Sequence, residues 1–225
     1  VMTLFRDTWL VFTRQVTLVL RNPVWLIVGI FQPLCFLLLF GPLLKGITQL
    51  GGGDAYQVFV PGLLIQLAMF GSMFVGFALI AELRAGVLER MRVTPVSRLA
   101  LLLGRCLRDI VSLLVQALIL VAIALPFGLR VKPADLALAM AMLALIGLLF
   151  SAFSYGVALL VRSEDALAPL LNSLVIPLLL LSGILLPLSL GPNWLRTIAQ
   201  WNPFSWAVDA ARALFAGHPG DPDVW

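Results

Sequence analysis

The chain has 225 residues, of which 61% are hydrophobic and 12% are charged, and its mean hydropathy is +1.06. A soluble domain carries about twice that share of charge, so the composition excludes a soluble globular protein and predicts one that is partly solvated by lipid. The net charge of +4 indicates basic loops at an anionic membrane surface rather than nucleic-acid binding. Two cysteines, Cys35 and Cys106, are too few for a disulfide framework.

Five uncharged apolar stretches predict an all-α polytopic membrane protein. A bilayer core about 30 Å thick requires ~20 apolar residues of helix. The stretches that meet this requirement without any Asp, Glu, Lys or Arg are 23–44, 58–81, 110–129, 136–161 and 166–190. We therefore expect five transmembrane helices in a single transmembrane domain that covers 1–225.

Basic residues flank these stretches unevenly. Ten arginines precede the first stretch, separate the second from the third, or follow the fourth: Arg6, Arg14, Arg21, Arg84, Arg90, Arg92, Arg98, Arg105, Arg108 and Arg162. The other side holds five basic residues: Lys45, Arg130, Lys132, Arg196 and Arg212. The positive-inside rule therefore predicts a cytoplasmic N-terminus and, with five spans, an external segment at 191–225.

The segments before the first span and after the fifth are expected to follow the membrane surface. Within the connecting segment 1–22, residues 3–21 predict an amphipathic interfacial helix. Its polar face would hold Thr3, Asp7, Arg14, Thr17 and Arg21, and its apolar face Phe5, Trp9, Phe12, Val16 and Val19. After the fifth span, the proline-rich stretch 187–201 predicts a re-entrant segment. Asn202-Pro203 predicts the N-cap and first turn of an outer helix that runs to about residue 215.

The motifs that would carry catalysis are missing from the sequence. A nucleotide-binding P-loop needs G-x-x-x-x-G-K-[ST], and neither Lys45 nor Lys132 fits that pattern. The single histidine, His218, follows the apolar stretches, so neither a histidine metal site nor a Ser-His pair is expected within the membrane. No acidic residue lies in mid-span, so an ion-coupled carrier would lack its usual charges. We expect no enzyme activity, metal or cofactor in this chain.

The segment 82–109 is the longest charged connection, and we expect it in the cytoplasm. A short helix over about 86–93 would end before Thr94-Pro95, since the residue before proline disfavours helix. Ser97 would cap the helix that leads into the third span. Such a projecting, charged segment suits a partner surface, but it would equally serve as a plain positive-inside anchor. The residues alone leave both interpretations open.

Three motifs resemble a known family. The segment 88–98 reads LERMRVTPVSR and is followed by Gly104-Arg105, 181–187 reads LSGILLP, and 201–212 reads WNPFSWAVDAAR. Together they are similar to the daunorubicin-resistance-type permeases, which are type-2 ABC exporter membrane subunits. The motifs occur in the same order as in that family, and with the N-terminal amphipathic helix the resemblance covers essentially the whole chain.

The resemblance implies specific partners and roles. In that family the loop after the second span forms a coupling helix that docks on a separate ATPase subunit, which binds ATP and magnesium. The docking residues implied here are Glu89, Arg90, Arg92, Thr94 and Pro95. The N-terminal connecting helix would touch the ATPase as well, and a second permease subunit would meet this one around spans two and five. A sixth span follows in the family, and we expect one beyond Trp225 in the full-length protein.

Polar residues within the spans have two interpretations. Candidates for lining a translocation path are Gln32, Gln66, Gln116, Asn172 and Ser173. Such residues more often form hydrogen bonds between helices, each worth about 0.6–2 kcal/mol. The small-residue pairs Ser72/Gly76 and Gly147/Ser151 indicate close helix packing.

These features predict the permease subunit of an ATP-driven ABC exporter in the plasma membrane. Its apolar path would suit hydrophobic drugs, lipids or lipid-linked glycans. The alternative is a channel or ATP-independent carrier, which would share the spans but need no docking segment. An intramembrane enzyme would need paired catalytic groups at one depth, and the spans contain none. A purely structural membrane subunit also remains open.

Overall fold

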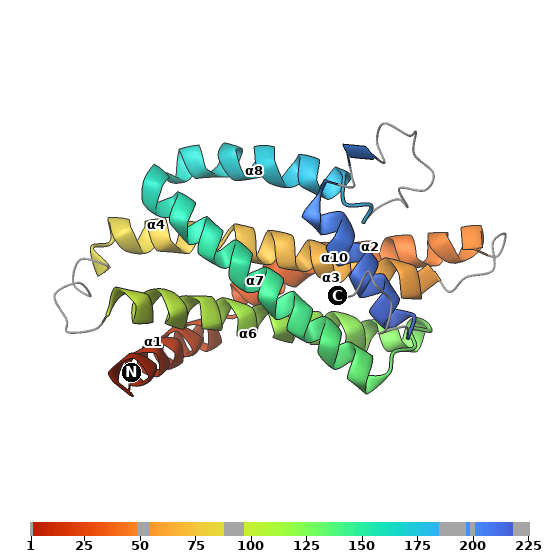
Figure 1. The fold of residues 1–225 in the computed structure, drawn as a ribbon, viewed down its shortest axis with the longest axis horizontal. Helices are drawn as coiled ribbons and strands as arrows, with labels where there is room; N and C mark the ends of the chain where they lie inside the picture. Colours follow the sequence, from red (N-terminus) through yellow and green to blue (C-terminus); the bar gives the residue numbers. More distant parts are fainter. Residues whose placement is uncertain (1, 49–54, 88–96, 185–196, 199–200, 218–225) are drawn as a thin grey trace.

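The computed structural model describes residues 2–48, 55–87, 97–184, 197–198 and 201–217, and within these ranges the chain is helical with no strand (Figure 1). The prediction of an all-α fold is confirmed. The helices are α1 (Met2–Arg21), α2 (Val24–Thr48), α3 (Ala55–Met73), α4 (Gly76–Arg84), α6 (Arg98–Ala124), the 3₁₀ helix η1 (Leu125–Phe127), α7 (Pro133–Val161), α8 (Glu164–Leu180) and α10 (Pro203–Phe215).

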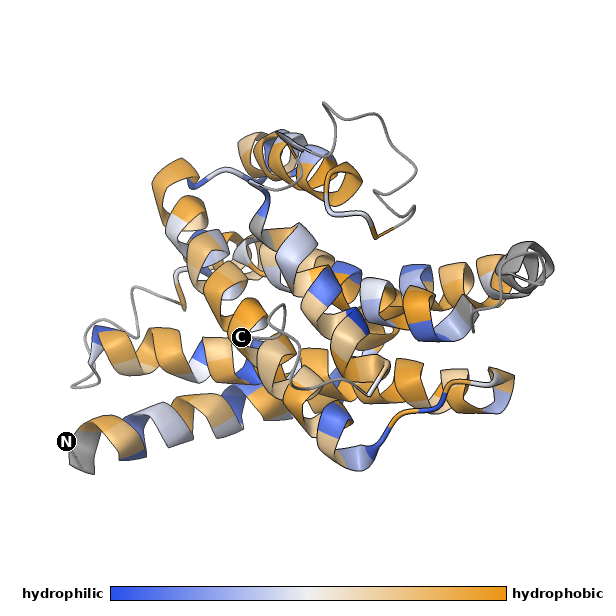
Figure 2. Ribbon diagram, turned by 45° about the vertical axis from the view of Figure 1, so that its right-hand side comes forward, coloured by the Kyte–Doolittle hydropathy of each residue, from blue (hydrophilic) through white to orange (hydrophobic). Residues whose placement is uncertain are grey.

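Several of these helices are long and apolar enough to cross a bilayer. Three stretches meet that requirement within the described residues: Tyr56–Arg84, Arg98–Phe127 and Pro133–Val161. The α1 and α2 helices bend by 67° at their junction and count as a fourth if they are taken as one broken span. The α8 helix has 17 residues, begins two residues before the fifth apolar stretch and covers the first part of it. Orange, hydrophobic residues cover most of these helices in Figure 2. The chain is therefore a multi-pass membrane protein.

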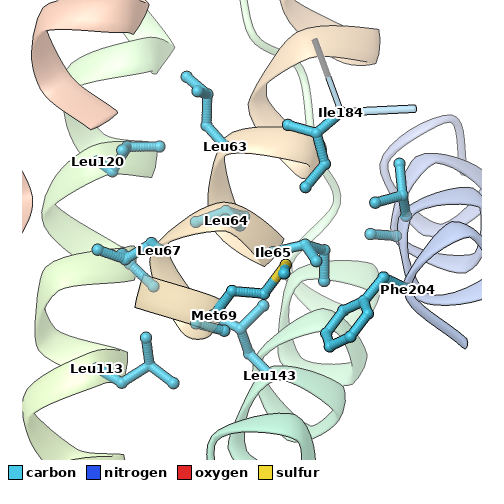
Figure 3. Close-up of a cluster of buried hydrophobic side chains, with 14 of the residues drawn as sticks. Leu63, Leu64, Ile65, Leu67, Met69, Leu113, Leu120, Leu143, Ile184 and Phe204 are labelled. Atoms are coloured by element: carbon cyan, nitrogen blue, oxygen red, sulfur yellow. The ribbon is translucent and has the colours of Figure 1, made fainter. Parts of the chain in front are cut away.

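The α3 helix forms the centre of the bundle. It packs against α2, α6, α7 and α10, and its residues 59–69 are buried on every side, with Gln66 as the one polar side chain among them. Figure 3 shows Leu63 and Leu67 of α3 next to Leu113 and Leu120 of α6, and Met69 beside Leu143 of α7. Most of the second span is enclosed within its own subunit. Only its few exposed residues remain for contact with lipid or with another protein chain.

Small residues let α7 approach the junction between α3 and α4. A Cβ on Gly76 would lie 2.8 Å from the Ser154 hydroxyl and 2.9 Å from the Ser154 carbonyl. A Cβ on Gly147 would lie 3.3 Å from the Ser72 hydroxyl. The prediction that the small-residue pairs mark close helix packing is confirmed. Ser154 also accepts a hydrogen bond from the Gly76 N–H (2.9 Å) and donates one to the Met73 carbonyl (2.5 Å).

The α1 helix packs along the first half of α6. Its inner face carries small or polar residues: Thr8 and Gln15 are buried, and a Cβ on Gly104 of α6 would lie 2.7 Å from the Val11 side chain. Phe5 and Trp9, from the predicted apolar face, are 76% and 56% exposed. The helix is amphipathic as predicted, but the predicted apolar face is only partly turned away from the protein, because Phe12, Val16 and Val19 are half-buried.

The α10 helix begins at the predicted residue. The Asn202 side chain accepts from the Phe204 N–H (3.0 Å) and donates to the Leu178 carbonyl (3.0 Å), so it caps α10 and joins it to α8. Phe204 stacks on Phe150 of α7 with ring centroids 4.9 Å apart. One face of α10 is buried against α3 and α7. The predicted re-entrant segment 187–201 lies outside the described residues except for 197–198 and Trp201.

Candidate functional site

A buried polar network joins α4, α6 and α7 near the segment that separates α4 from α6. Arg105 of α6 forms an ion pair with Glu82 of α4, and Arg108 forms one with Asp109. The Tyr155 hydroxyl of α7 donates a hydrogen bond to Asp109 and accepts one from Arg108 (3.3 Å). Arg105, Asp109 and Tyr155 are 4%, 8% and 1% exposed. Four charged groups and a phenol thus connect three helices inside the bundle.

Helical spacing explains why α6 supplies three of these groups. Positions i, i+3 and i+4 share one face of a helix, and Arg105, Arg108 and Asp109 have this spacing. The helix begins where the Ser97 hydroxyl accepts a hydrogen bond from the Ala100 N–H (3.1 Å), as predicted from the sequence. The α6 helix therefore starts about three turns before the third uncharged stretch, 110–129, and carries these charges on one continuous helix.

The charges of the network cancel, since two arginines face two carboxylates. Burying such groups is costly, and it is tolerated only when each charge is paired. The Nε atoms of Arg105 and Arg108 are buried and have no hydrogen-bond partner. Removing Glu82 would leave the buried Arg105 guanidinium without its partner, and removing Arg108 would leave the buried Asp109 carboxylate without its ion pair. The network therefore fixes the relative positions of α4, α6 and α7.

A second ion pair lies at the same end of the bundle. Arg84, the last residue of α4, lies 3.5 Å from Glu164 in the first turn of α8. Both side chains are largely exposed, at 56% and 38%, so this pair contributes little to stability. It nevertheless places the end of α4 next to the start of α8. The end of α4, the end of α7 and the start of α8 thus lie together, and α6 starts at the same end of the bundle, at the left of Figure 1.

The predicted docking residues lie in that segment. Glu89, Arg90, Arg92, Thr94 and Pro95 fall outside the described residues, as does most of the short helix expected over 86–93. On either side of the segment, Gly86 adopts a left-handed conformation with φ of +67° and Ser97 caps α6. These two residues mark the turn out of α4 and the start of α6.

The predicted path residues are dispersed. Gln32 of α2 and Asn172 and Ser173 of α8 are exposed on the outside of the bundle, and Ser173 donates to the carbonyl of Leu170 in its own helix (2.8 Å). Gln66 is 1% exposed in the core, and neither of its amide atoms has a hydrogen-bond partner.

Gln116 is 7% exposed and donates from Nε2 to the Leu26 carbonyl of α2 (2.8 Å), which is the interhelical role foreseen as the alternative. The structure does not gather the five predicted residues around one cavity.

Sequence analysis missed the buried network itself. The spacing of Arg105, Arg108 and Asp109 places all three on one face of a helix, and this pattern could have indicated a shared polar contact. The sequence analysis instead treats them as part of the charged connection 82–109. Glu82, the partner of Arg105, is 23 residues away in sequence, so only the fold brings it close. Among the described residues no group of three or more His, Cys, Asp or Glu side chains is arranged to hold a metal ion.

An all-helical bundle with several apolar helices long enough to span a bilayer is typical of a polytopic membrane protein. Comparison with known families identifies it: the chain belongs to the ABC-2 type transporter family, whose model matches residues 6–216. It is therefore a permease subunit of an ABC transporter, and membership of this family implies an ABC ATPase subunit as its partner.

Named relatives support this assignment. The chain is 32% identical to the daunorubicin resistance ABC transporter permease protein DrrB1 of Streptomyces coeruleorubidus, over 90% of this chain and 72% of the relative. It is 31% identical to the putative transport permease ycf38 of Cyanophora paradoxa, over 87% and 69%. It is 26% identical to the probable doxorubicin resistance permease DrrC of Mycobacterium tuberculosis, over 95% and 78%. No solved structure matches the chain significantly.

Proposed function

We propose that this permease works as the membrane half of an ATP-driven exporter and receives force at the 88–96 segment. Glu89, Arg90, Arg92, Thr94 and Pro95 are the proposed docking residues for the ATPase, which would bind the ATP and magnesium. In this proposal the N-terminus and the docking segment face the cytoplasm, as the arginine distribution favours.

The observation that carries this proposal is the buried network. It includes Glu82 from α4 and Arg105 from α6, the two helices that border the docking segment, and Tyr155 from α7. Buried ion pairs resist separation because breaking one leaves an unpaired charge in a medium of low dielectric constant. A displacement of the docking segment would therefore move these helices together. This behaviour is what a force-transmitting element requires.

Nucleotide binding can drive transport only if it favours one conformation of the complex over another. The ATPase would supply this difference in binding, and the network would pass the resulting motion into the bundle. A second permease subunit would complete the assembly. The second span exposes mainly small residues, Gly71, Ala78 and Ala81, which suit close approach of another helix, and α8 presents an exposed apolar face.

The proposed substrates are hydrophobic drugs, lipids or lipid-linked glycans. Two relatives are named for daunorubicin and doxorubicin resistance, which favours an amphipathic drug-like substrate. Gln32, Asn172 and Ser173 lie on the exposed sides of α2 and α8. We assign these three to a path formed between two subunits, since a path inside one subunit would require them to face its interior.

The test is a double charge reversal, Arg90→Glu with Arg92→Glu, in the permease co-expressed with its ATPase. We expect affinity for the ATPase to fall by more than about tenfold, because two docking charges would become repulsive, and ATP-dependent transport in proteoliposomes to be lost. Arg162→Glu is the matched control, since Arg162 is an exposed arginine that follows α7 at the same end of the bundle.

Two results would contradict the proposal. One is an intact, active complex with the double reversal. The other is substrate flux through the permease alone without any ATPase, as a channel or uncoupled carrier would give. The orientation has its own test: if a Thr94→Cys variant is labelled only from outside the cell, the docking segment does not face the cytoplasm.

A further inference from the structure

A polar pocket of about 250 Å³ lies at the end of the bundle opposite the docking segment. It is formed where the turn between η1 and α7 meets the start of α3 and the last turn of α10, at the right of Figure 1. The residues that line it are Gln57, Arg130, Val131, Lys132, Asp135, Phe215, Ala216 and Gly217. The network described above contributes none of them, so the pocket is a separate feature of the molecule.

One side of the pocket holds a carboxylate whose Oδ2 atom has no hydrogen-bond partner. Asp135 is only 4% exposed, and its Oδ2 atom is buried with no hydrogen-bond partner. An acid in the first turn of α7 would stabilise that helix end from solvent, and this role does not call for burial. A buried, unpaired carboxylate is unfavourable unless a cation or donor completes it. Asp135 therefore points to a ligand group that carries positive charge.

The last turn of α10 adds to the negative side. The final carbonyls of a helix have no partners within the helix and carry partial negative charge. Phe215, Ala216 and Gly217 all line the pocket at this helix end. The end of α10 thus borders the same pocket as the Asp135 carboxylate. These acceptors suit a primary ammonium, which offers three N–H donors, better than a quaternary ammonium, which offers none.

The other side of the pocket is positive. Arg130 and Lys132 are exposed and form no ion pair with any described residue. The Lys132 Nζ and Asp135 Oδ2 atoms lie 3.6 Å and 3.9 Å from the position that a Cβ would occupy on Gly217. Gly217 has φ of +79°, a conformation that favours glycine, and its missing side chain leaves the space between the two charges open.

We propose that this pocket binds the phosphoethanolamine headgroup of a phospholipid in the leaflet at that end of the protein. The ammonium would pair with Asp135 and the end of α10, and the phosphate would pair with Arg130 and Lys132. The position supports a lipid, since these residues directly follow one candidate span and begin the next, at headgroup depth. A phosphoglycerol headgroup would offer Asp135 hydroxyl donors but no positive charge, and a phosphocholine headgroup would supply no N–H donor.

The test uses native mass spectrometry of the full-length permease with phosphatidylethanolamine, phosphatidylcholine and phosphatidylglycerol of identical acyl chains. We expect phosphatidylethanolamine to bind about tenfold more tightly than the other two, the factor that a single charge-assisted hydrogen bond can supply. Asp135→Asn keeps the shape of the side chain and should abolish this preference. Asp165→Asn, an exposed acid at the opposite end of the bundle, should leave it unchanged.

A second pair of variants tests the phosphate side. Combined Arg130→Gln and Lys132→Gln, both at exposed positions, should lower retention of all three lipids, whereas Arg162→Gln should not. Equal retention of the three lipids, or a preference that survives Asp135→Asn, would overturn the proposal. Displacement of the lipid by an equal concentration of soluble phosphoethanolamine would overturn the assignment to a bilayer lipid and favour a soluble ligand.

Discussion

The ion pair between Glu82 and Arg105 allows a quantitative test of the buried network. The perturbation is a double-mutant cycle with Glu82→Gln, Arg105→Gln and the combined variant. The Arg105 side chain is 5% exposed and the Glu82 side chain is 27% exposed. Loss of Glu82 leaves a guanidinium enclosed, whereas loss of Arg105 leaves a carboxylate that water can reach.

The expected magnitude follows from this asymmetry. Breaking a fully buried pair costs about 3–5 kcal/mol. Because Glu82 is partly exposed, we expect about 2–3 kcal/mol for Glu82→Gln and a smaller loss for Arg105→Gln. The combined variant should recover part of the loss, which gives a coupling energy of about 2 kcal/mol, within the range observed for residues in one network.

The assay is unfolding of the purified permease by sodium dodecyl sulfate in mixed micelles, followed by tryptophan fluorescence. The same cycle on Arg84 and Glu164 is the control, since that pair joins two helices at the same end of the bundle but is largely exposed. Its coupling energy should be below about 0.5 kcal/mol. Equal coupling energies in the two cycles would refute the view that burial makes the network rigid.

Two further predictions concern packing and capping. Gly76→Ala should destabilise the permease by about 1–3 kcal/mol, because the new Cβ would meet Ser154 at 2.8 Å; Gly156→Ala, with no atom within 4 Å of the new Cβ, should be neutral or stabilising in the same unfolding assay. Asn202→Ala should lower the free energy of unfolding by about 1–2 kcal/mol, because α10 loses its cap and the hydrogen bond to Leu178. Asn202→Asp keeps the cap and loses only the amide donor, so it should cost less. An equal loss in the two variants would contradict the capping role.

Helix content was the part of this fold that the sequence predicted best. Uncharged runs of 20 or more residues have few alternatives in a bilayer, and local signals such as Ser97 and Asn202 mark helix starts through one side chain and a nearby N–H. Sequence analysis also anticipated close helix packing at Gly76 and Gly147, since small residues at helical spacing have one common use in membranes.

The remaining features depend on contacts between distant residues. Only the fold pairs Glu82 with Arg105. The sequence prediction begins the third span at residue 110, directly after charged residues that the structure keeps inside the bundle. The interruption between α3 and α4 contains no proline, so no local signal predicted it. The polar inner face of α1 is likewise set by a partner, because Gly104 admits the α1 backbone closely. The docking assignments for Arg90 and Arg92 stay predictions.

The interruption between α3 and α4 has a mechanical consequence. At this point the Phe77 and Ala78 N–H groups bond three residues back, to Phe74 and Val75, and the Gly76 N–H bonds to Ser154 on a different helix. The second span is therefore an interrupted helix, and a hydrogen bond from Gly76 to Ser154 holds the interruption against α7. The α3 half is anchored in the apolar centre, so a displacement of the α4 half would exchange the hydrogen bonds at this interruption and, because Glu82 is paired with Arg105, would carry α6 with it.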